Sequence, residues 1–245
     1  MDNRKVIFKD LGIIDYKKAR DYQEELLQQN VAIKSANRKT QELTNAATQQ
    51  SPILTHKKTT NYFLFCEHPA VYTLGKSGNI DNVLMTEAEL AANDIQFFNT
   101  NRGGDITFHG LQQIVGYPIL DLENFYTDIG KYLRNLEEVI ILTIAAYGLK
   151  GERSSGETGV WIQPGVPGKE RKICAIGVRC SRWITMHGFA LNVNTDLIYF
   201  NNIIPCGIQN KQVTSIEKEL GFKINYEEVK EKIKQNFKSV FEANE

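Results

Sequence analysis

Residues 172–193 read K-I-C-A-I-G-V-R-C-S-R-W-I-T-M-H-G-F-A-L-N-V. Two apolar runs, 172–179 and 183–193, flank a short polar interruption, which predicts two strands joined by a tight turn. Side chains alternate along a strand, so Lys172, Cys174 and Ile176 are expected on one face. Consecutive strands joined in this way pair antiparallel.

Segments on both sides of this pair extend the pattern. Strand-like runs occupy 4–8, 61–66, 70–74, 113–121 and 160–163. Helical spacing of apolar residues begins after Asp15 and returns in 129–147, 214–220 and 226–241. Strands dominate the middle of the chain and helices bracket them. We therefore predict an α+β fold with a central mixed, largely antiparallel sheet and flanking helices.

The predicted organisation is a single catalytic domain over 1–245. A small helical part is expected at 211–245. The stretch 34–60 is polar and is expected to extend the first helix at its start and then to form a mobile insertion.

Composition excludes some classes of function. The chain has 245 residues, with 29 basic and 29 acidic side chains and a formal charge of zero. A neutral chain has no global attraction to nucleic acid or to a membrane, so neither is expected as a partner. The N-terminus has no apolar signal region, and we expect a cytoplasmic protein whose cysteines are free thiols.

Two residues suggest nucleophilic chemistry. Cys206 lies in Pro205-Cys206-Gly207, a sequence typical of a tight turn that presents its side chain. A thiol becomes a good nucleophile as the thiolate, and an ammonium nearby favours that form; Lys172 is the candidate. Two other readings remain open: a lysine at a strand end that reaches solvent, and an inert buried cysteine. Burial is the expected state of Cys66, Cys174 and Cys180.

Glycines mark a second candidate region. Arg102-Gly103-Gly104 opens the loop R-G-G-D-I-T-F-H-G, where backbone could approach a ligand closely and where Thr107 and His109 add polar groups. A plain structural turn explains paired glycines equally, and for His187, before Gly188, a structural role is the commoner one. No G-K-[ST] follows, which excludes a P-loop. The four histidines, at 56, 68, 109 and 187, lack metal-ligand spacing, so no metal is expected.

Taken together, these segments resemble the lipoyl(octanoyl) transferase family. The matching blocks are E-H-P-A-V-Y-T-L-G (67–75), R-G-G-D-I-T-F-H-G (102–110), Q-I-V-G-Y-P-I-L-D-L (113–122), K-I-C-A-I-G-V-R (172–179), S-R-W-I-T-M-H-G-F-A-L-N-V (181–193) and I-P-C-G-I (204–208). They run in the family's order. The sequence departs from the family at Leu111-Gln112, where proline and glycine are usual, so the turn after His109 could be shaped differently.

The resemblance implies a fold shared with biotin and lipoate protein ligases, and no cofactor. It implies transfer of an octanoyl or lipoyl group from acyl carrier protein to a lysine of lipoyl domains, as in 2-oxoacid dehydrogenase complexes and the glycine cleavage H protein. Cys206 would form the acyl-thioester and Lys172 would lower its pKa. Substrate-binding residues implied by the resemblance are Arg102, Gly103, Gly104, Asp105, Ile106, Thr107, Phe108, His109, Ala175, Ile176, Gly177, Gly188, Phe189 and Ala190.

Side chains for an acyl tunnel and for docking can also be suggested. Candidates for the tunnel are Tyr117, Phe108, Ile176 and Leu191, and basic candidates for docking an acidic carrier are Lys57-Lys58, Arg171-Lys172 and Arg179 with Arg182. Three alternatives remain open: an ATP-dependent lipoate or biotin ligase on the same fold, a cysteine hydrolase using Cys206 with His109 or His187, and a non-catalytic lipoyl-binding scaffold.

Overall fold

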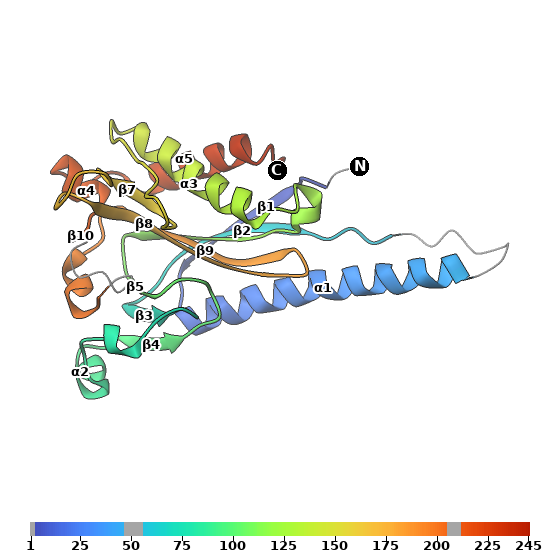
Figure 1. The fold of residues 1–245 in the computed structure, drawn as a ribbon, viewed down its shortest axis with the longest axis horizontal. Helices are drawn as coiled ribbons and strands as arrows, with labels where there is room; N and C mark the ends of the chain where they lie inside the picture. Colours follow the sequence, from blue (N-terminus) through green and yellow to red (C-terminus); the bar gives the residue numbers. More distant parts are fainter. Residues whose placement is uncertain (1–2, 47–55, 205–211) are drawn as a thin grey trace.

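The computed structural model describes residues 3–46, 56–204 and 212–245 (Figure 1). Its centre is a seven-stranded sheet that joins distant parts of the chain. The strand order is β1 (Val6–Ile13), β2 (Asn61–Glu67), β6 (Gln113–Ile119), β9 (Ile184–Asn192), β8 (Arg171–Ser181) and β10 (Gln212–Val213), with β7 (Val160–Ile162) also paired to β8. The pairs β1–β2 and β8–β10 are parallel and the others antiparallel. The predicted mixed, largely antiparallel sheet is confirmed.

The two strands predicted in the opening stretch are β8 and β9, which pair antiparallel within this sheet. Their register runs from Cys174 opposite Leu191 to Ser181 opposite Ile184. The first strand is longer than predicted and the turn is shorter, because only Arg182 and Trp183 lie between the strands. Both have positive φ, 51° and 67°, which matches the twist of a two-residue hairpin turn but usually requires glycine or asparagine.

Contacts outside the hairpin stabilise this unusual turn. The Arg182 guanidinium donates to the Ser35 hydroxyl of helix α1 (Tyr16–Ala46), and the Trp183 carbonyl accepts the Leu122 N–H at 2.8 Å. The turn is therefore held by its neighbours rather than by the intrinsic preference of its residues.

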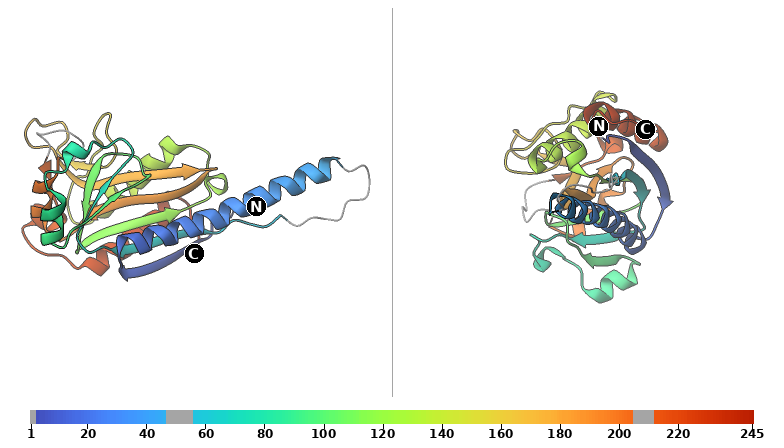
Figure 2. Two further views of the ribbon diagram at one scale, coloured as in Figure 1. Left: turned by 90° about the horizontal axis from the view of Figure 1, so that it is seen from below. Right: turned by 90° about the vertical axis from the view of Figure 1, so that its right-hand side faces the viewer.

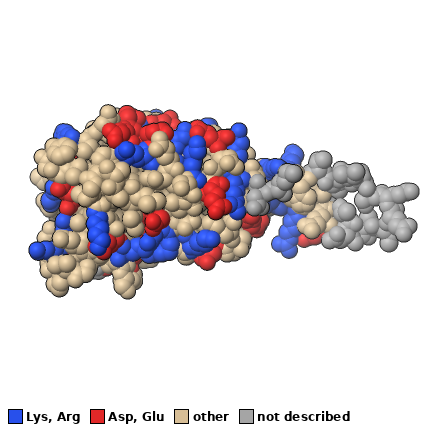
Figure 3. Space-filling model, turned by 90° about the horizontal axis from the view of Figure 1, so that it is seen from above, with Lys and Arg blue, Asp and Glu red and all other residues tan. Residues whose placement is uncertain are grey.

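Helices cover both faces of the sheet, as Figures 1 and 2 show. On one face lie α3 (Ile129–Ala145) and α5 (Tyr226–Val240), with Leu136, Ile140 and Phe237 fully buried against the strands. On the other face lies α1 (Tyr16–Ala46), which buries Leu26 and Leu27. The predicted helices over 129–147 and 226–241 are confirmed to within a few residues. On the α3/α5 side, basic and acidic side chains are interspersed, and neither sign dominates (Figure 3).

A three-stranded sheet lies beside α1, in the order β4 (Gln96–Asn99), β3 (Val71–Leu74), β5 (Ile106–His109). It has a small apolar cluster of its own that includes Tyr72, Ile106 and Phe108. Thr86 is the N-cap of helix α2 (Glu87–Ala92) and forms a capping box with Glu89. The remaining short elements are η1 (Ile80–Asn82), η2 (Leu122–Asn124), η3 (Leu197–Asn202) and α4 (Ile216–Leu220).

Helix α1 continues well into the polar stretch 34–60, farther than the sequence suggests, and its outer half projects beyond the sheet (Figures 1 and 2). Two asparagine amides on α1 pair with the backbone that returns beside it. Asn30 exchanges two hydrogen bonds with Thr60, at 2.8 and 2.9 Å, and Asn37 exchanges two with Lys57, at 2.7 and 3.1 Å. Polar residues serve this helix because much of it faces solvent and a neighbouring backbone, not an apolar core. Residues 47–55 of the predicted insertion lie outside the described part of the chain.

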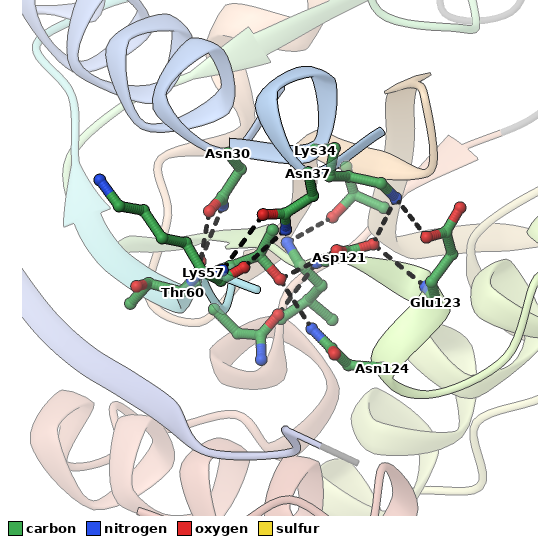
Figure 4. A network of polar contacts seen from close by, with 12 residues as sticks. Asn30, Lys34, Asn37, Lys57, Thr60, Asp121, Glu123 and Asn124 are labelled. Carbon is green, nitrogen blue, oxygen red and sulfur yellow. Dashed lines mark hydrogen bonds and ion pairs between the residues drawn. The ribbon is translucent and has the colours of Figure 1, made fainter. Parts of the chain in front are cut away.

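A polar cluster that we call the helix clasp joins α1 to the sheet (Figure 4). Lys34 of α1 forms ion pairs with Asp121 at 2.8 Å and with Glu123 at 2.9 Å. Asp121 is buried and also accepts the Thr59 hydroxyl at 2.9 Å, and Asn124 donates to that hydroxyl at 3.0 Å. The clasp therefore fixes α1 where its projecting half begins.

Candidate functional site

Residues of the large sheet, the three-stranded sheet and the first turns of α1 and α3 line a cavity of about 560 Å³. It contains Lys172 and every substrate-binding residue suggested by the sequence except Phe108. Phe108 instead packs away from it, stacked on Tyr199 with ring centroids 4.6 Å apart. Of the suggested tunnel residues, Tyr117 and Ile176 line the cavity, whereas Leu191 is buried in the core on the α3/α5 side. The structure thus brings together segments that lie up to 88 residues apart (190 − 102 = 88).

Glycines allow the 102–104 loop to lie directly on strand β8. The Gly103 N–H donates to the Val178 carbonyl at 2.9 Å. A Cβ added at Gly177 would lie 2.6 Å from the Gly103 oxygen, and one at Gly75 would lie 2.2 Å from the Gly104 oxygen. No side chain fits at such distances, so glycine at these two positions is what allows the 102–104 loop to pack this closely against the neighbouring strands.

Arg102 holds this loop from inside. Its side chain is buried, and its guanidinium donates to the Thr73 carbonyl at 2.6 Å, the Thr73 hydroxyl at 2.9 Å and the Gly103 carbonyl at 3.0 Å. A guanidinium has a fixed fork of donors, so these three acceptors fix the orientation of the loop relative to β3.

His109 is buried beside Arg102, and both ring nitrogens are engaged. Nδ1 lies 2.9 Å from Gln113 Oε1, and Nε2 lies 3.3 Å from the Thr73 hydroxyl. Burial holds the pKa of His109 well below its usual range, and the nearby His68 and Arg102 lower it further. The imidazole is therefore neutral, and it stacks on Tyr16 with centroids 6.0 Å apart.

Two further histidines near the cavity are also buried and neutral. Burial, with Arg102 nearby, lowers the pKa of His187 to about 3, and its Nε2 donates to Asn101 Oδ1 at 2.8 Å. Burial lowers the pKa of His68 to about 4; its Nδ1 donates to the Ile14 carbonyl at 2.7 Å and its Nε2 accepts the Tyr117 hydroxyl at 2.8 Å. None of these rings is ready to accept a proton near neutral pH.

Lys172 lies at the other end of the cavity, on β8. Its Nζ is 4.6 Å from the centre of the Trp161 ring on the adjacent β7, a cation–π arrangement that steers the ammonium. The neighbouring Gly159 has a φ of 127°, and a Cβ there would lie 2.6 Å from the Cys174 carbonyl oxygen. Glu137 accepts the Gly159 N–H at 3.1 Å and so holds this turn beside the lysine.

Cys206 lies outside the described residues, so its contact with Lys172 stays a prediction. The other three cysteines are described, and for each of them burial raises the thiol pKa. Cys66 and Cys174 are buried as predicted, and Cys180 is half-buried. Within the described ranges no group of three or more His, Cys, Asp or Glu side chains could hold a metal ion, and no helix is long and apolar enough to cross a bilayer.

Several cavity residues escaped sequence reasoning. They are Tyr16, Ser77, Gln113, Glu157, Thr158 and Asn192, joined by Thr73 behind the wall. Gln113 and Asn192 lie at strand ends, where polar residues are ordinary, so no local signal distinguishes them. Their role follows from pairing, because β6 places Gln113 directly opposite Asn192 of β9.

The Leu111-Gln112 departure has a clear structural outcome. Gln112 adopts a φ of 60°, the left-handed conformation that favours glycine. Its N–H donates to Glu67 at 2.6 Å, its carbonyl accepts the Thr195 hydroxyl at 3.0 Å, and its side-chain oxygen accepts Asn194 Nδ2 at 2.9 Å. The turn thus takes a backbone conformation that suits glycine, with hydrogen bonds offsetting the strain.

Comparison with solved structures supports the fold. Lipoate-protein ligase A bound with ATP superimposes with a TM-score of 0.64 at 12% identity, covering 100% of this chain and 87% of that chain. A bipartite lipoate protein ligase from Thermoplasma acidophilum gives 0.61 at 15% identity, covering 98% and 85%. Such low identity shows the fold alone, and it confirms the lipoate-ligase-like architecture.

Comparison with known sequences identifies the family. The profile described as lipoyl protein ligase A/B catalytic domain matches residues 41–238. An octanoyltransferase of Christiangramia forsetii is 58% identical over 242 residues, covering 98% of this chain and 97% of the relative. One of Flavobacterium psychrophilum is 57% identical over 242 residues, covering 98% of both chains. The chain therefore belongs to the lipoyl(octanoyl) transferase family, within the group that shares the lipoyl protein ligase A/B catalytic domain.

Proposed function

We propose that Cys206 and Lys172 carry the reaction of this acyltransferase, which moves an octanoyl group from acyl carrier protein to the lysine of a lipoyl domain. The observation that carries this proposal is the meeting of Lys172 with the 102–107 and 188–190 segments at one cavity. Those segments are far apart in sequence, so a random arrangement would not gather them.

The first step transfers the acyl group to the enzyme. The Cys206 thiolate attacks the thioester carbonyl, a bond forms between Sγ and the carbonyl carbon, and the bond to the carrier's sulfur breaks. The carrier leaves as a thiolate and takes up the proton that the Lys172 ammonium gives to it. The Lys172 ammonium favours the attacking thiolate, and backbone N–H groups of the 102–107 loop would hold the developing oxyanion.

The second step releases the acyl group to the acceptor. The lysine amine of the lipoyl domain must be neutral to attack, so a group has to accept a proton. Lys172, having given its proton in the first half-reaction, would take that proton, and Cys206 would leave as the thiolate. The amide product and the original enzyme result, so no nucleotide is consumed.

The shape of the cavity supports an acyl ligand. Its volume lies within the range of small-molecule sites, and apolar side chains line much of its wall. These are Ile129, Leu133, Ile176, Val178, Phe189, Phe200 and Val213. A chain of eight carbons would bury its apolar surface against them, which supplies binding energy without charge.

The protein partners follow from the family and not from a single surface patch. Lipoyl domains of 2-oxoacid dehydrogenase complexes and the glycine cleavage H protein are the proposed acceptors. Two basic residues suggested for carrier docking are already paired within the chain: Arg171 donates twice to Glu219 at 2.6 Å, and Arg179 pairs with Glu24 at 2.5 Å. These pairs leave less charge available to an acidic carrier.

Intact-protein mass after mixing with octanoyl-acyl carrier protein tests the proposal. The native chain should gain one octanoyl group, and Cys206→Ala should gain none. Cys180→Ala, which removes a half-buried thiol elsewhere, should keep the gain and serves as the matched control. Lys172→Met should slow acylation by about 100-fold or more, because the thiolate loses its cation. An octanoyl adduct on Cys206→Ala would refute the assignment.

Two rivals are separated by the same assay. An ATP-dependent ligase, suggested by the fold neighbour bound with ATP, would modify a lipoyl domain from octanoic acid, ATP and magnesium without a carrier. A hydrolase would release octanoic acid without transfer to an amine. The hydrolase is disfavoured because the lowered pKa values of the buried His109 and His187 make both rings poor proton acceptors, and both rings are already hydrogen-bonded.

A further inference from the structure

A chain of five side chains links the two walls of the cavity, and we call it the cavity relay. It ends on the backbone of Thr214, whose N–H donates to the Lys172 carbonyl at 3.0 Å. Every link is a hydrogen bond of 3.3 Å or less, and each member is largely buried. The members are Arg102, Thr73, His109, Gln113 and Asn192.

The donors and acceptors in the relay can be oriented from its ends. The Thr214 carbonyl only accepts, so Asn192 must turn its Nδ2 toward it, at 3.0 Å, and its Oδ1 toward Gln113. Gln113 Nε2 then donates to Asn192 Oδ1 at 2.8 Å and to the Phe108 carbonyl at 3.1 Å. Gln113 Oε1 is left facing His109 Nδ1, and an amide oxygen accepts only.

The other end of the relay is compatible with this orientation. The Arg102 guanidinium only donates, and it reaches the Thr73 hydroxyl at 2.9 Å. The Thr73 proton is then available for His109 Nε2 at 3.3 Å. His109 must carry its proton on Nδ1 and a lone pair on Nε2, which is the neutral tautomer that Gln113 also requires.

We propose that Gln113 is a positioning residue of this site: it holds His109 as the neutral Nδ1–H tautomer and, through His109 and Thr73, fixes Arg102 and the cavity loop. His109 is then a structural link and not a proton carrier, because both nitrogens are committed. Gln113 also fastens the loop side of the cavity to Asn192 and so to the strand that bears Lys172. The spectroscopic test below does not depend on the proposed function, whereas the kinetic test does, because it measures acylation of the enzyme.

The tautomer can be observed directly by nitrogen-15 NMR of the imidazole rings between pH 6 and 8. The His109 signals are assigned by comparison with a His109→Asn variant. We expect a protonated Nδ1, an unprotonated Nε2 and no titration in this range. In Gln113→Leu this fixed tautomer should be lost. A native His109 that carries its proton on Nε2, or that titrates, would overturn the proposal.

Rates of octanoyl-enzyme formation test the positioning role. Gln113→Leu and Thr73→Val each leave buried polar partners unpaired and should slow acylation by about 10- to 100-fold. Thr73→Ser restores the hydroxyl and should recover most of the rate. Gln112→Ala, which changes the adjacent turn outside the relay, should stay within about threefold of the native rate.

The two proposals fail in different ways. If the native chain forms no octanoyl-enzyme, the proposed function fails. The NMR measurement of the His109 tautomer still tests whether Gln113 orients the relay. If the native chain is acylated and Thr73→Val, folded by circular dichroism, keeps its rate within about threefold, Gln113 and its relay do not position the site. Thr73→Val serves here because it changes a single hydroxyl, even if Gln113→Leu does not fold.

Discussion

Strand β9 has a polar cluster at each end, and the two clusters are built differently. At its Ile184 end, which bridges to Asp121, the helix clasp uses a buried carboxylate and a lysine. At its Asn192 end, the cavity relay uses amides, a hydroxyl and a neutral imidazole, with a single charge on Arg102. One cluster fixes a projecting helix and the other fixes the wall of a cavity.

The difference teaches how each end is stabilised. An ion pair such as Lys34 with Asp121 tolerates small movements, since charge attraction falls slowly with distance, but it requires both partners. In the relay the four members other than Arg102 are neutral, so each costs less to desolvate than an ion does, and their hydrogen bonds allow one orientation, which suits a wall that must keep its shape. The predictions below test this contrast, from the largest expected effect to the smallest.

The clasp should be the more sensitive to loss of one member. Asp121→Ala removes the acceptor of Lys34 and of the Thr59 hydroxyl, and we expect a loss of about 3 kcal/mol in the free energy of unfolding. Urea denaturation measures it. The matched control is Glu123→Ala, which removes the exposed partner of Lys34 and should cost less than about 1 kcal/mol. Equal losses of stability in both variants would mean that the buried Asp121 contributes no more to stability than the exposed Glu123.

The cavity wall should be sensitive to added volume. Gly177→Ala would place a methyl group 2.6 Å from the Gly103 carbonyl oxygen, so the loop has to move. We expect a loss of about 2 kcal/mol in stability and at least a tenfold loss in acylation rate. Gly165→Ala is the control, because its Cβ would meet nothing within 4 Å. An unchanged acylation rate in Gly177→Ala would show that the loop position is unimportant.

The neutral histidines should make stability depend on pH. The pKa of His68 is about 4 in the folded chain and about 6.5 when unfolded, so the unfolded state binds more protons between these values. The stabilisation is fully present above pH 6.5 and is lost as pH falls toward 4. For His68 alone we expect about 1 kcal/mol less stability at pH 5.5 than at 7.5.

His68→Gln provides the comparison for this pH effect. Its baseline stability can differ, but its decline between pH 7.5 and 5.5 should be smaller than that of the native chain by the same amount. An identical decline in both chains would show that His68 is not neutral in the fold.

The turn after His109 should respond least. Gln112→Gly relieves the strain of a left-handed backbone at this position. It also removes a side-chain hydrogen bond and gives the unfolded chain more conformational freedom. These effects oppose each other, so the net change in the free energy of unfolding should be under about 0.5 kcal/mol. Gln112→Ala keeps the strain and loses the bond, and should be less stable than Gln112→Gly. The reverse order, measured by thermal unfolding, would contradict the strain argument.

Sequence patterns foresaw the parts of the fold that depend on local chemistry. The apolar runs around 172–193 predicted the two strands of the β8–β9 hairpin, and the helical spacing over 129–147 predicted α3. Strands β4, β5 and β10 were missed, β5 within the stretch 102–110 that the sequence suggested as a loop, because runs of four, four and two residues are too short to show periodicity. The length of α1 was underestimated, since a helix held by asparagine-to-backbone contacts has no apolar stripe in its outer half.

The resemblance predicted most of the residues that line the cavity, but it did not predict the hydrogen bonds that join the members of the cavity relay. The glycine pairs and Lys172 can be recognised as candidates from the sequence alone. The role of Gln113 and Asn192 can be recognised only once β6 and β9 are known to pair. Phe108 shows the converse, since alternation along β5 turns it away from its neighbours Thr107 and His109. Pairings between distant strands are nonlocal and leave no mark in a single sequence.

The first and last described segments of the chain hydrogen-bond to each other. Lys5 and Asn244 form a parallel bridge, with the Val6 N–H on the Asn244 carbonyl at 2.8 Å and the Asn244 N–H on the Arg4 carbonyl at 3.0 Å. A short peptide could therefore tie them into a ring, and the ring could be cut at the exposed turn around Gly165 to give a circular permutant. Fusion partners attached beside Lys5 and Asn244 would emerge side by side, so a split reporter placed there would read out whether this pairing forms.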